Sequence, residues 1–139
     1  METTTSQPIV LLITPLKPPP AHDHTAVLKK SGFTVVNHTH EDASVPEILS
    51  LDPRIIVAEL GDGGRVAMFD MVRRLKAHPT VRHIPLIIYG VGLTADEIEA
   101  TAHAGAMWLQ LEPTDEYKLL AAIRGVLRAC LTHDVVHGC

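Results

Sequence analysis

The sequence predicts an α/β protein whose core is a doubly wound parallel sheet of five strands, with helices on both faces. Five short apolar runs rich in β-branched residues alternate along the chain with five segments of helical periodicity. The runs lack the polar alternation of half-exposed strands, which indicates strands that are covered on both faces. The connections are short, and right-handed crossovers fold such a series into a single parallel sheet.

The first half of the chain provides three of the predicted strands. The apolar run over residues 8–13 ends at the proline-rich segment 15–20, which cannot continue a strand. Gly32 is a typical residue after a helix end, and Pro46 suits the first turn of a helix. In order, we predict a strand over 8–13, a helix over 21–31, a strand over 33–39, a helix over 44–51 and a strand over 55–60.

The second half follows the same alternation. Apolar residues recur at helical spacing after the glycine-rich loop 61–64, and Pro79 lies just beyond the end of that helix. Thr94 and Glu97 form a capping box, and Gly105 follows the helix that they begin. In order, we predict a helix over 66–77, a strand over 84–89, a helix over 94–104, a strand over 107–111 and a last helix from 115 to about 131.

Length and composition indicate one domain. The chain has 139 residues, of which 46% are hydrophobic, enough for a single core. We expect residues 8–131 to form this domain, residues 1–7 to be disordered and residues 132–139 to be a C-terminal tail. No apolar run approaches the roughly 20 residues that span a membrane, and residues 1–7 lack the features of a signal peptide. We therefore expect a cytoplasmic protein without membrane contacts.

Charge and cysteine content exclude further classes. Twelve lysines and arginines against sixteen aspartates and glutamates give a net charge of −4, and no basic run is present. A direct nucleic-acid partner is therefore not expected. Cys130 and Cys139 give neither a disulfide framework nor the spacing of a zinc finger, which favours a reducing compartment.

Four short segments keep the order and spacing of one known family. They are Asp-Pro-Arg-Ile-Ile-Val-Ala-Glu at 52–59, Arg-Arg-Leu-Lys at 73–76, His-Ile-Pro-Leu-Ile-Ile-Tyr at 83–89 and Ala-Gly-Ala at 104–106. Through these segments, residues 8–131 resemble the receiver domain of bacterial response regulators. The resemblance implies a CheY-like, flavodoxin-like fold of three α/β/α layers with strand order 2-1-3-4-5, and a role in two-component or phosphorelay signalling.

The resemblance also implies where a phosphorylation pocket would lie. Active receivers hold a carboxylate nucleophile beside a Mg²⁺ ion, while a hydroxyl and a lysine bind the incoming phosphoryl oxygens and neutralise their charge. The matching positions of this sequence are Thr14 and Pro15 for the acidic metal-binding pair, Glu59 for the nucleophile, Gly61 in the loop after it, Gly90 for the hydroxyl and Glu112 for the lysine.

Each of these positions departs from the pattern of active receivers. Without carboxylates at Thr14 and Pro15 there is little to hold Mg²⁺, which prefers oxygen ligands in strict geometry. Glu112 places a second negative charge where a lysine would attract phosphate to Glu59. We therefore predict a pseudo-receiver that is not phosphorylated, is not an enzyme and needs no cofactor. Its expected partner is a protein: a sensor kinase, an output protein or a second copy of the chain. An active receiver with an atypical pocket is an alternative.

Histidines near the carboxyl ends of the first two strands suggest a different class of function. His22 and His24 begin the first predicted helix, and His38 and His40 close the second predicted strand. Two histidines separated by one residue on an extended chain point to the same side, and imidazole is a suitable ligand for Zn²⁺, Ni²⁺ or Cu²⁺. These four residues are candidates for a metal- or small-ligand-binding flavodoxin-like protein, although we expect no metal to be bound.

The fifth predicted strand carries Trp108, the only tryptophan of the chain, beside Leu109. We predict that the fourth helix, the fifth strand and the fifth helix form the partner-binding face, because a strand at the sheet edge leaves its neighbourhood uncovered. Exposed apolar groups commonly mark interaction sites, and tryptophan is favoured in them. Packing of Trp108 beneath a neighbouring helix is the alternative.

Overall fold

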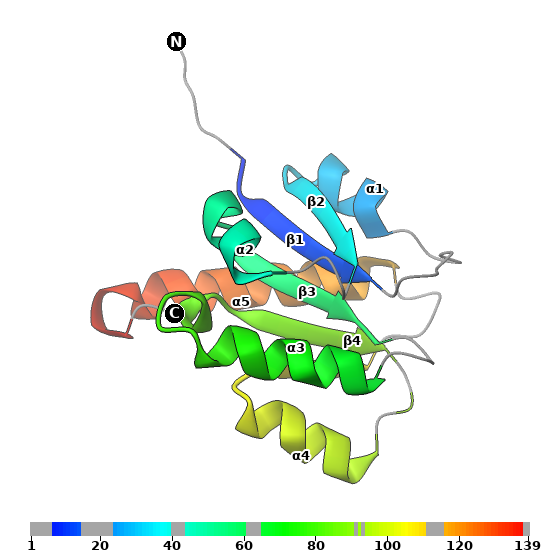
Figure 1. Ribbon diagram of the computed structural model, residues 1–139. Helices are drawn as coiled ribbons and strands as arrows, with labels where there is room; N and C mark the ends of the chain where they lie inside the picture. Colours follow the sequence, from blue (N-terminus) through cyan, green and yellow to red (C-terminus); the bar gives the residue numbers. More distant parts are fainter. Residues whose placement is uncertain are drawn as a thin grey trace.

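The computed structural model describes residues 7–14, 24–39, 44–60, 65–90, 92, 94–110 and 116–137. Within these residues, strands and helices alternate along the chain (Figure 1). The strands are β1 (Ile9–Thr14), β2 (Thr34–Thr39), β3 (Ile55–Glu59), β4 (Leu86–Gly90) and β5 (Met107–Gln110). The helices are α1 (His24–Lys30), α2 (Val45–Leu51), α3 (Arg65–Ala77), the 3₁₀-helix η1 (Val81–His83), α4 (Ala95–His103) and α5 (Glu116–His137).

The strands form one parallel sheet in the order β2-β1-β3-β4-β5, which confirms the predicted topology. The inner strands β1, β3 and β4 are buried along most of their length, whereas the edge strands β2 and β5 are partly exposed. Because the carboxyl ends of parallel strands lie at one edge of the sheet, Thr14, Glu59 and Gly90 are brought to the same edge.

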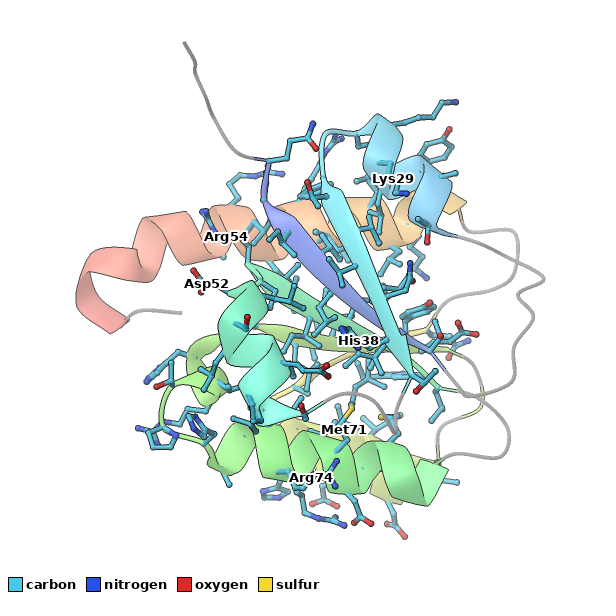
Figure 2. The ribbon with its side chains drawn as sticks, turned by 45° about the horizontal axis from the view of Figure 1, so that its top comes forward. Lys29, His38, Asp52, Arg54, Met71 and Arg74 are labelled. Atoms are coloured by element: carbon cyan, nitrogen blue, oxygen red, sulfur yellow. The ribbon has the colours of Figure 1, made fainter. Side chains whose placement is uncertain are left out.

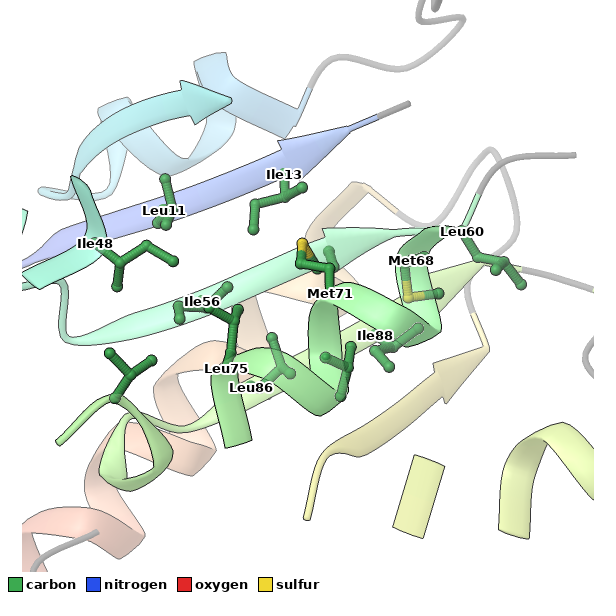
Figure 3. Close-up of a cluster of buried hydrophobic side chains, with 13 residues drawn as sticks. Leu11, Ile13, Ile48, Ile56, Leu60, Met68, Met71, Leu75, Leu86 and Ile88 are labelled. Atoms are coloured by element: carbon green, nitrogen blue, oxygen red, sulfur yellow. The ribbon is translucent and has the colours of Figure 1, made fainter. Parts of the chain in front are cut away.

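Two hydrophobic clusters cover the two faces of the sheet. One packs Ile56 and Ile88 of the sheet against Met68 and Met71 of α3, with α2 beside them (Figure 3). The other packs the opposite face against α1 and α5, through residues such as Leu28, Leu119 and Ile123. Neighbouring residues of a strand therefore belong to different clusters, as the uninterrupted apolar runs predict.

The capping box predicted for the fourth helix and the place of Pro46 in the second are confirmed, and the second helix has a further cap at Ser44. The Ser44 hydroxyl accepts a hydrogen bond from the backbone N–H of Glu47 at the start of α2, where Pro46 occupies the first turn. At the start of α4, Thr94 and Glu97 form the predicted capping box with both of its hydrogen bonds. Among the described helices, none combines the length and the apolar character that crossing a membrane requires.

The largest difference from the predicted elements is the end of α5. The helix continues to His137, beyond the predicted end at Leu131, so most of the predicted tail 132–139 is helical. Residues 132–137 contain no glycine or proline, and the first residue that favours a helix end is Gly138. The predicted start of the first helix, residues 21–23, lies outside the described residues, as do residues 1–6. The short helix η1 was not predicted, and it delays the start of β4 to Leu86.

Lys76, near the end of α3, forms hydrogen bonds that connect this helix to the segment that precedes β4. Its ammonium group donates hydrogen bonds to the carbonyl oxygens of Arg82, at 3.1 Å, and of Ile84, at 3.2 Å. The side chain is half-buried, and this desolvation lowers the pKa of the Lys76 ammonium below its ordinary value of 10.5.

The lowered pKa of Lys76 predicts a pH-dependent contribution to stability. The unfolded chain keeps the ordinary lysine pKa and so binds this proton more strongly than the folded chain does. The free energy of unfolding should therefore rise, relative to that of a Lys76→Met variant, as the pH rises toward 10.5. Urea denaturation of both proteins over a pH series measures this difference. A difference that stays flat, or that falls as the pH rises, would contradict the prediction.

Candidate functional site

The described part of the candidate pocket lies at the carboxyl edge of β1, β3 and β4. Thr14, Glu59 and Gly90 are the last residues of these three strands, so the structure brings together the three described positions of the predicted pocket. Pro15, Gly61 and Glu112 lie outside the described residues.

Glu59 is held by a tyrosine of the adjacent strand. Glu59 and Tyr89 are directly paired in the register of β3 and β4, and the Tyr89 hydroxyl donates a hydrogen bond of 3.2 Å to the Glu59 carboxylate. The Tyr89 side chain is buried in the cluster on the α1 and α5 side of the sheet, whereas Glu59 is half-buried. A buried tyrosine hydroxyl needs such a partner, and the bond orients the carboxylate along the sheet edge.

Gly90 has a backbone conformation that favours glycine. Its φ of 153° lies in a region that residues with a side chain rarely adopt. A Cβ atom at this position would stand 3.0 Å from the Cβ of Leu60 and 3.3 Å from its carbonyl oxygen. Leu60 is itself fixed, because it is buried and its N–H donates a 2.8 Å hydrogen bond to the carbonyl of Tyr89. A side chain at this position would therefore be strained, and Leu60 would have to shift by a few tenths of an ångström to admit it.

These donors do not fit a magnesium ion. Mg²⁺ in proteins is held by one or two carboxylates together with waters and phosphate oxygens in octahedral geometry. Thr14 offers a hydroxyl and no carboxylate, Pro15 has a side chain without a donor atom, and Glu59 supplies the one carboxylate among these three residues. One carboxylate without further charged oxygen ligands makes a weak site for this ion.

The candidate metal ligands are only partly described. His38 lies on β2, with its Nδ1 atom 4.0 Å from a carboxylate oxygen of Glu47 on α2. The backbone of His24 begins α1, while His22 and His40 lie outside the described residues. In the part of the chain that the structure describes, no three histidine, cysteine, aspartate or glutamate side chains come together as a metal site would require.

The predicted partner-binding residues are half-buried on opposite faces of β5. Trp108 packs against the cluster beneath α2 and α3, and Leu109 packs against the cluster beneath α1 and α5. The exposed apolar side chains of the predicted face are others: Ile98 on α4, 41% exposed, Met107 on β5, 46%, and Tyr117 on α5, 66%.

The sequence analysis missed Tyr89 and these three exposed residues. Tyr89 ends a buried apolar strand, and a tyrosine in that place must direct its hydroxyl to a polar group, which is a usable signal in the sequence. Ile98 stands four residues after the helix cap Thr94 and carries no comparable signal, because its exposure depends on how α4 packs beside β5.

Several solved structures are similar to this chain over most of its length. The signal receiver domain of a histidine kinase from Syntrophus aciditrophicus has a TM-score of 0.66 and 20% sequence identity, covering 86% of this chain and 90% of that one. Chemotaxis protein CheY4 of Vibrio cholerae has a TM-score of 0.67 and 15% identity, covering 86% and 98%. A response regulator from Desulfuromonas acetoxidans has a TM-score of 0.64 and 22% identity, covering 88% and 98%.

These similarities establish the fold. The chain has the flavodoxin-like fold of the receiver domains of response regulators, as the sequence segments predicted. No protein-family model matches the sequence, and no curated protein matches it.

Proposed function

We propose that this chain is a pseudo-receiver module of a two-component signalling system, which is not phosphorylated and acts by binding a protein partner. The observation that carries the proposal is the altered pocket edge within a receiver fold. A side chain at Gly90 would crowd Leu60, and a glutamate, Glu59, occupies the position of the phosphate-accepting aspartate and accepts a hydrogen bond from Tyr89. A module without phosphoryl transfer is not an enzyme and needs no cofactor.

The charge pattern of the sequence supports the loss of phosphoryl transfer. Transfer requires positive charge at the developing phosphoryl oxygens, from a metal ion and a lysine. Here glutamate occupies the lysine position at Glu112, and no acidic pair stands at Thr14 and Pro15. Glu112 repels an incoming phosphate, and the residues at Thr14 and Pro15 supply no carboxylate to hold a metal ion, so neither source of positive charge is present in this sequence.

The exposed apolar residues support a role in protein binding. Ile98, Met107 and Tyr117 belong to the three elements that the sequence analysis assigned to the partner-binding face. Exposed large apolar side chains on a small domain favour an interaction surface. The partner is a sensor kinase, an output protein or a second copy of the chain, and the cytoplasm is the compartment that suits these partners.

A phosphorylation assay tests the proposal. Incubation with acetyl phosphate and Mg²⁺ should add no phosphate to the protein in intact-protein mass spectrometry, because the chain lacks the groups that bind and neutralise the phosphoryl oxygens. The matched control is Glu59→Gln, which keeps an oxygen to accept the Tyr89 hydrogen bond but cannot act as a carboxylate nucleophile. A mass increase of one phosphate in the original protein that is absent in Glu59→Gln would overturn the proposal in favour of an active receiver.

The fluorescence of Trp108 provides a second readout of the same proposal. Trp108 is the only tryptophan of the chain and pairs in register with Ile88 of β4, two residues before Gly90. Beryllofluoride with Mg²⁺ should leave its emission unchanged, since a ligand shifts a conformation only when it binds one state better. A saturable change in emission that requires Glu59 would contradict an inactive pocket.

A further inference from the structure

Basic side chains lie along the amino edge of the sheet, opposite to the candidate pocket, on segments that belong to both of its faces. We refer to these residues as the basic edge: Lys29, Lys30, Arg54, Arg73, Arg74, Lys76 and Arg82. The ends of α1 and α3 reach this edge because each helix runs antiparallel to the strands. Figure 2 shows Lys29, Arg54 and Arg74 on three separate segments of the chain.

Backbone contacts join the segments at the centre of the basic edge. Arg54 immediately precedes β3, and its N–H donates a 2.9 Å hydrogen bond to the carbonyl of Ile9 at the start of β1. The N–H of Ile56 donates a bond of the same length to the carbonyl of Pro85, close behind η1 and Arg82. The helices α2 and α3 both contact η1. Arg54 and Arg82 therefore lie on adjoining segments of the amino edge, and Arg74 lies on the helix α3 that contacts η1.

Little negative charge opposes these cations. Arg73 forms an ion pair with Asp70, and Lys76 donates to backbone carbonyls. The other five members of the basic edge are exposed, and none of them forms an ion pair with a described residue: Lys29, Lys30, Arg54, Arg74 and Arg82. Asp52, which lies near Arg54 in Figure 2, is the carboxylate that the described residues place at this edge. A positive surface thus forms on a chain whose net charge is −4.

Helix ends explain only part of this surface. Lys29, Lys30 and Arg74 lie in the last turns of α1 and α3, where positive charge is favoured by the helix dipole. Arg54 lies on no helix, and Arg82 lies on the single 3₁₀ turn of η1. These two arginines add positive charge to the edge that the helix dipoles do not explain.

Exposed apolar groups at the same edge favour a protein partner over nucleic acid. Leu49, in the last turn of α2, is 41% exposed, and Met107, the first residue of β5, is 46% exposed. Arginine and methionine are both enriched in protein interfaces.

We infer that the basic edge is a docking surface for an acidic segment of a partner protein, with Arg54, Arg74 and Arg82 binding its carboxylates. Arginine suits this role because its guanidinium group pairs with a carboxylate through two parallel hydrogen bonds. The surface lies at the opposite edge from the pocket and shares only Met107 with the partner-binding face, so this inference goes beyond the proposed function and does not depend on phosphorylation.

The test uses a fluorescein-labelled, glutamate-rich peptide of twelve residues and measures fluorescence anisotropy. The peptide should bind the full chain at low salt and bind more weakly as the salt concentration rises, because exposed ion pairs are screened. The double variant Arg54→Glu/Arg82→Glu should bind about tenfold or more weakly. The matched control, Lys118→Glu/Arg124→Glu, makes the same change in net charge at exposed positions of α5 outside the basic edge, and should bind within about twofold of the original protein.

Three results would overturn the inference. They are no binding of the peptide at low salt, an equal loss of affinity in both double variants, and tighter binding of duplex DNA or of phosphatidylserine vesicles than of the peptide. Circular dichroism shows that the variants remain folded, which we expect because all four substituted side chains are exposed.

Discussion

Gly90→Thr, the substitution that would restore a hydroxyl to the pocket, should destabilise the protein by about 2–4 kcal/mol. Part of this loss is the strain of a branched residue at a φ of 153°, and part is overlap with Leu60, whose Cβ would stand 3.0 Å from the new Cβ. Thermal unfolding should show a Tm lowered by about 8–15 °C for a chain of this size.

Gly32 provides the matched control for this substitution. It also has a positive φ, of 97°, but a Cβ atom there would meet no other atom within 4 Å. Gly32→Thr therefore carries the backbone strain without the overlap, and it should cost less than Gly90→Thr. Equal losses of Tm would mean that contact with Leu60 contributes nothing. A Gly90→Thr protein as stable as the original would mean that the pocket is open to a side chain.

Ile88→Ala should lower the free energy of unfolding by about 3–4 kcal/mol, measured by urea denaturation. Ile88 is fully buried at the centre of β4 and faces the cluster that contains Met68 and Met71 (Figure 3). Truncation removes apolar contacts and leaves a cavity between the sheet and α3, which two rigid elements cannot collapse to fill.

The conservative variant Ile88→Val separates packing from any effect on the pocket. It removes one methylene group and should cost about 1 kcal/mol. Ile88 and Tyr89 face opposite sides of the sheet, so neither variant should alter the response to acetyl phosphate. A loss below about 1 kcal/mol for Ile88→Ala would contradict the close packing of this cluster.

The sheet was predictable from the sequence because its signals are local and repeated. Apolar runs without polar alternation indicate that β1, β3 and β4 are inner strands, and the capping box of Thr94 and Glu97 indicates the start of α4. The helix η1 gave no such signal, because it depends on His78, whose ring nitrogen accepts hydrogen bonds from the N–H groups of Thr80 and Val81. Contacts of this kind follow from the folded turn and have no periodicity in the sequence.

The candidate site was predictable in its positions but not in its geometry. The sequence analysis placed Glu59 and Gly90 in the pocket, and the structure brings them to one edge of the sheet. The bond from Tyr89 to Glu59 depends on the register between β3 and β4, and the crowding at Gly90 depends on the position of Leu60. Register and atomic overlap are properties of the packed sheet, which no single segment of sequence specifies.

The conformation of Gly90 also bears on how this edge of the sheet could be engineered. A Cβ atom at position 90 would stand 3.0 Å from the Cβ of Leu60, in a backbone conformation that residues with a side chain rarely adopt. Engineering a side chain at this position would therefore have to begin with the packing around Leu60. The order in which substitutions are introduced is dictated by this packing, whatever chemistry they are meant to add.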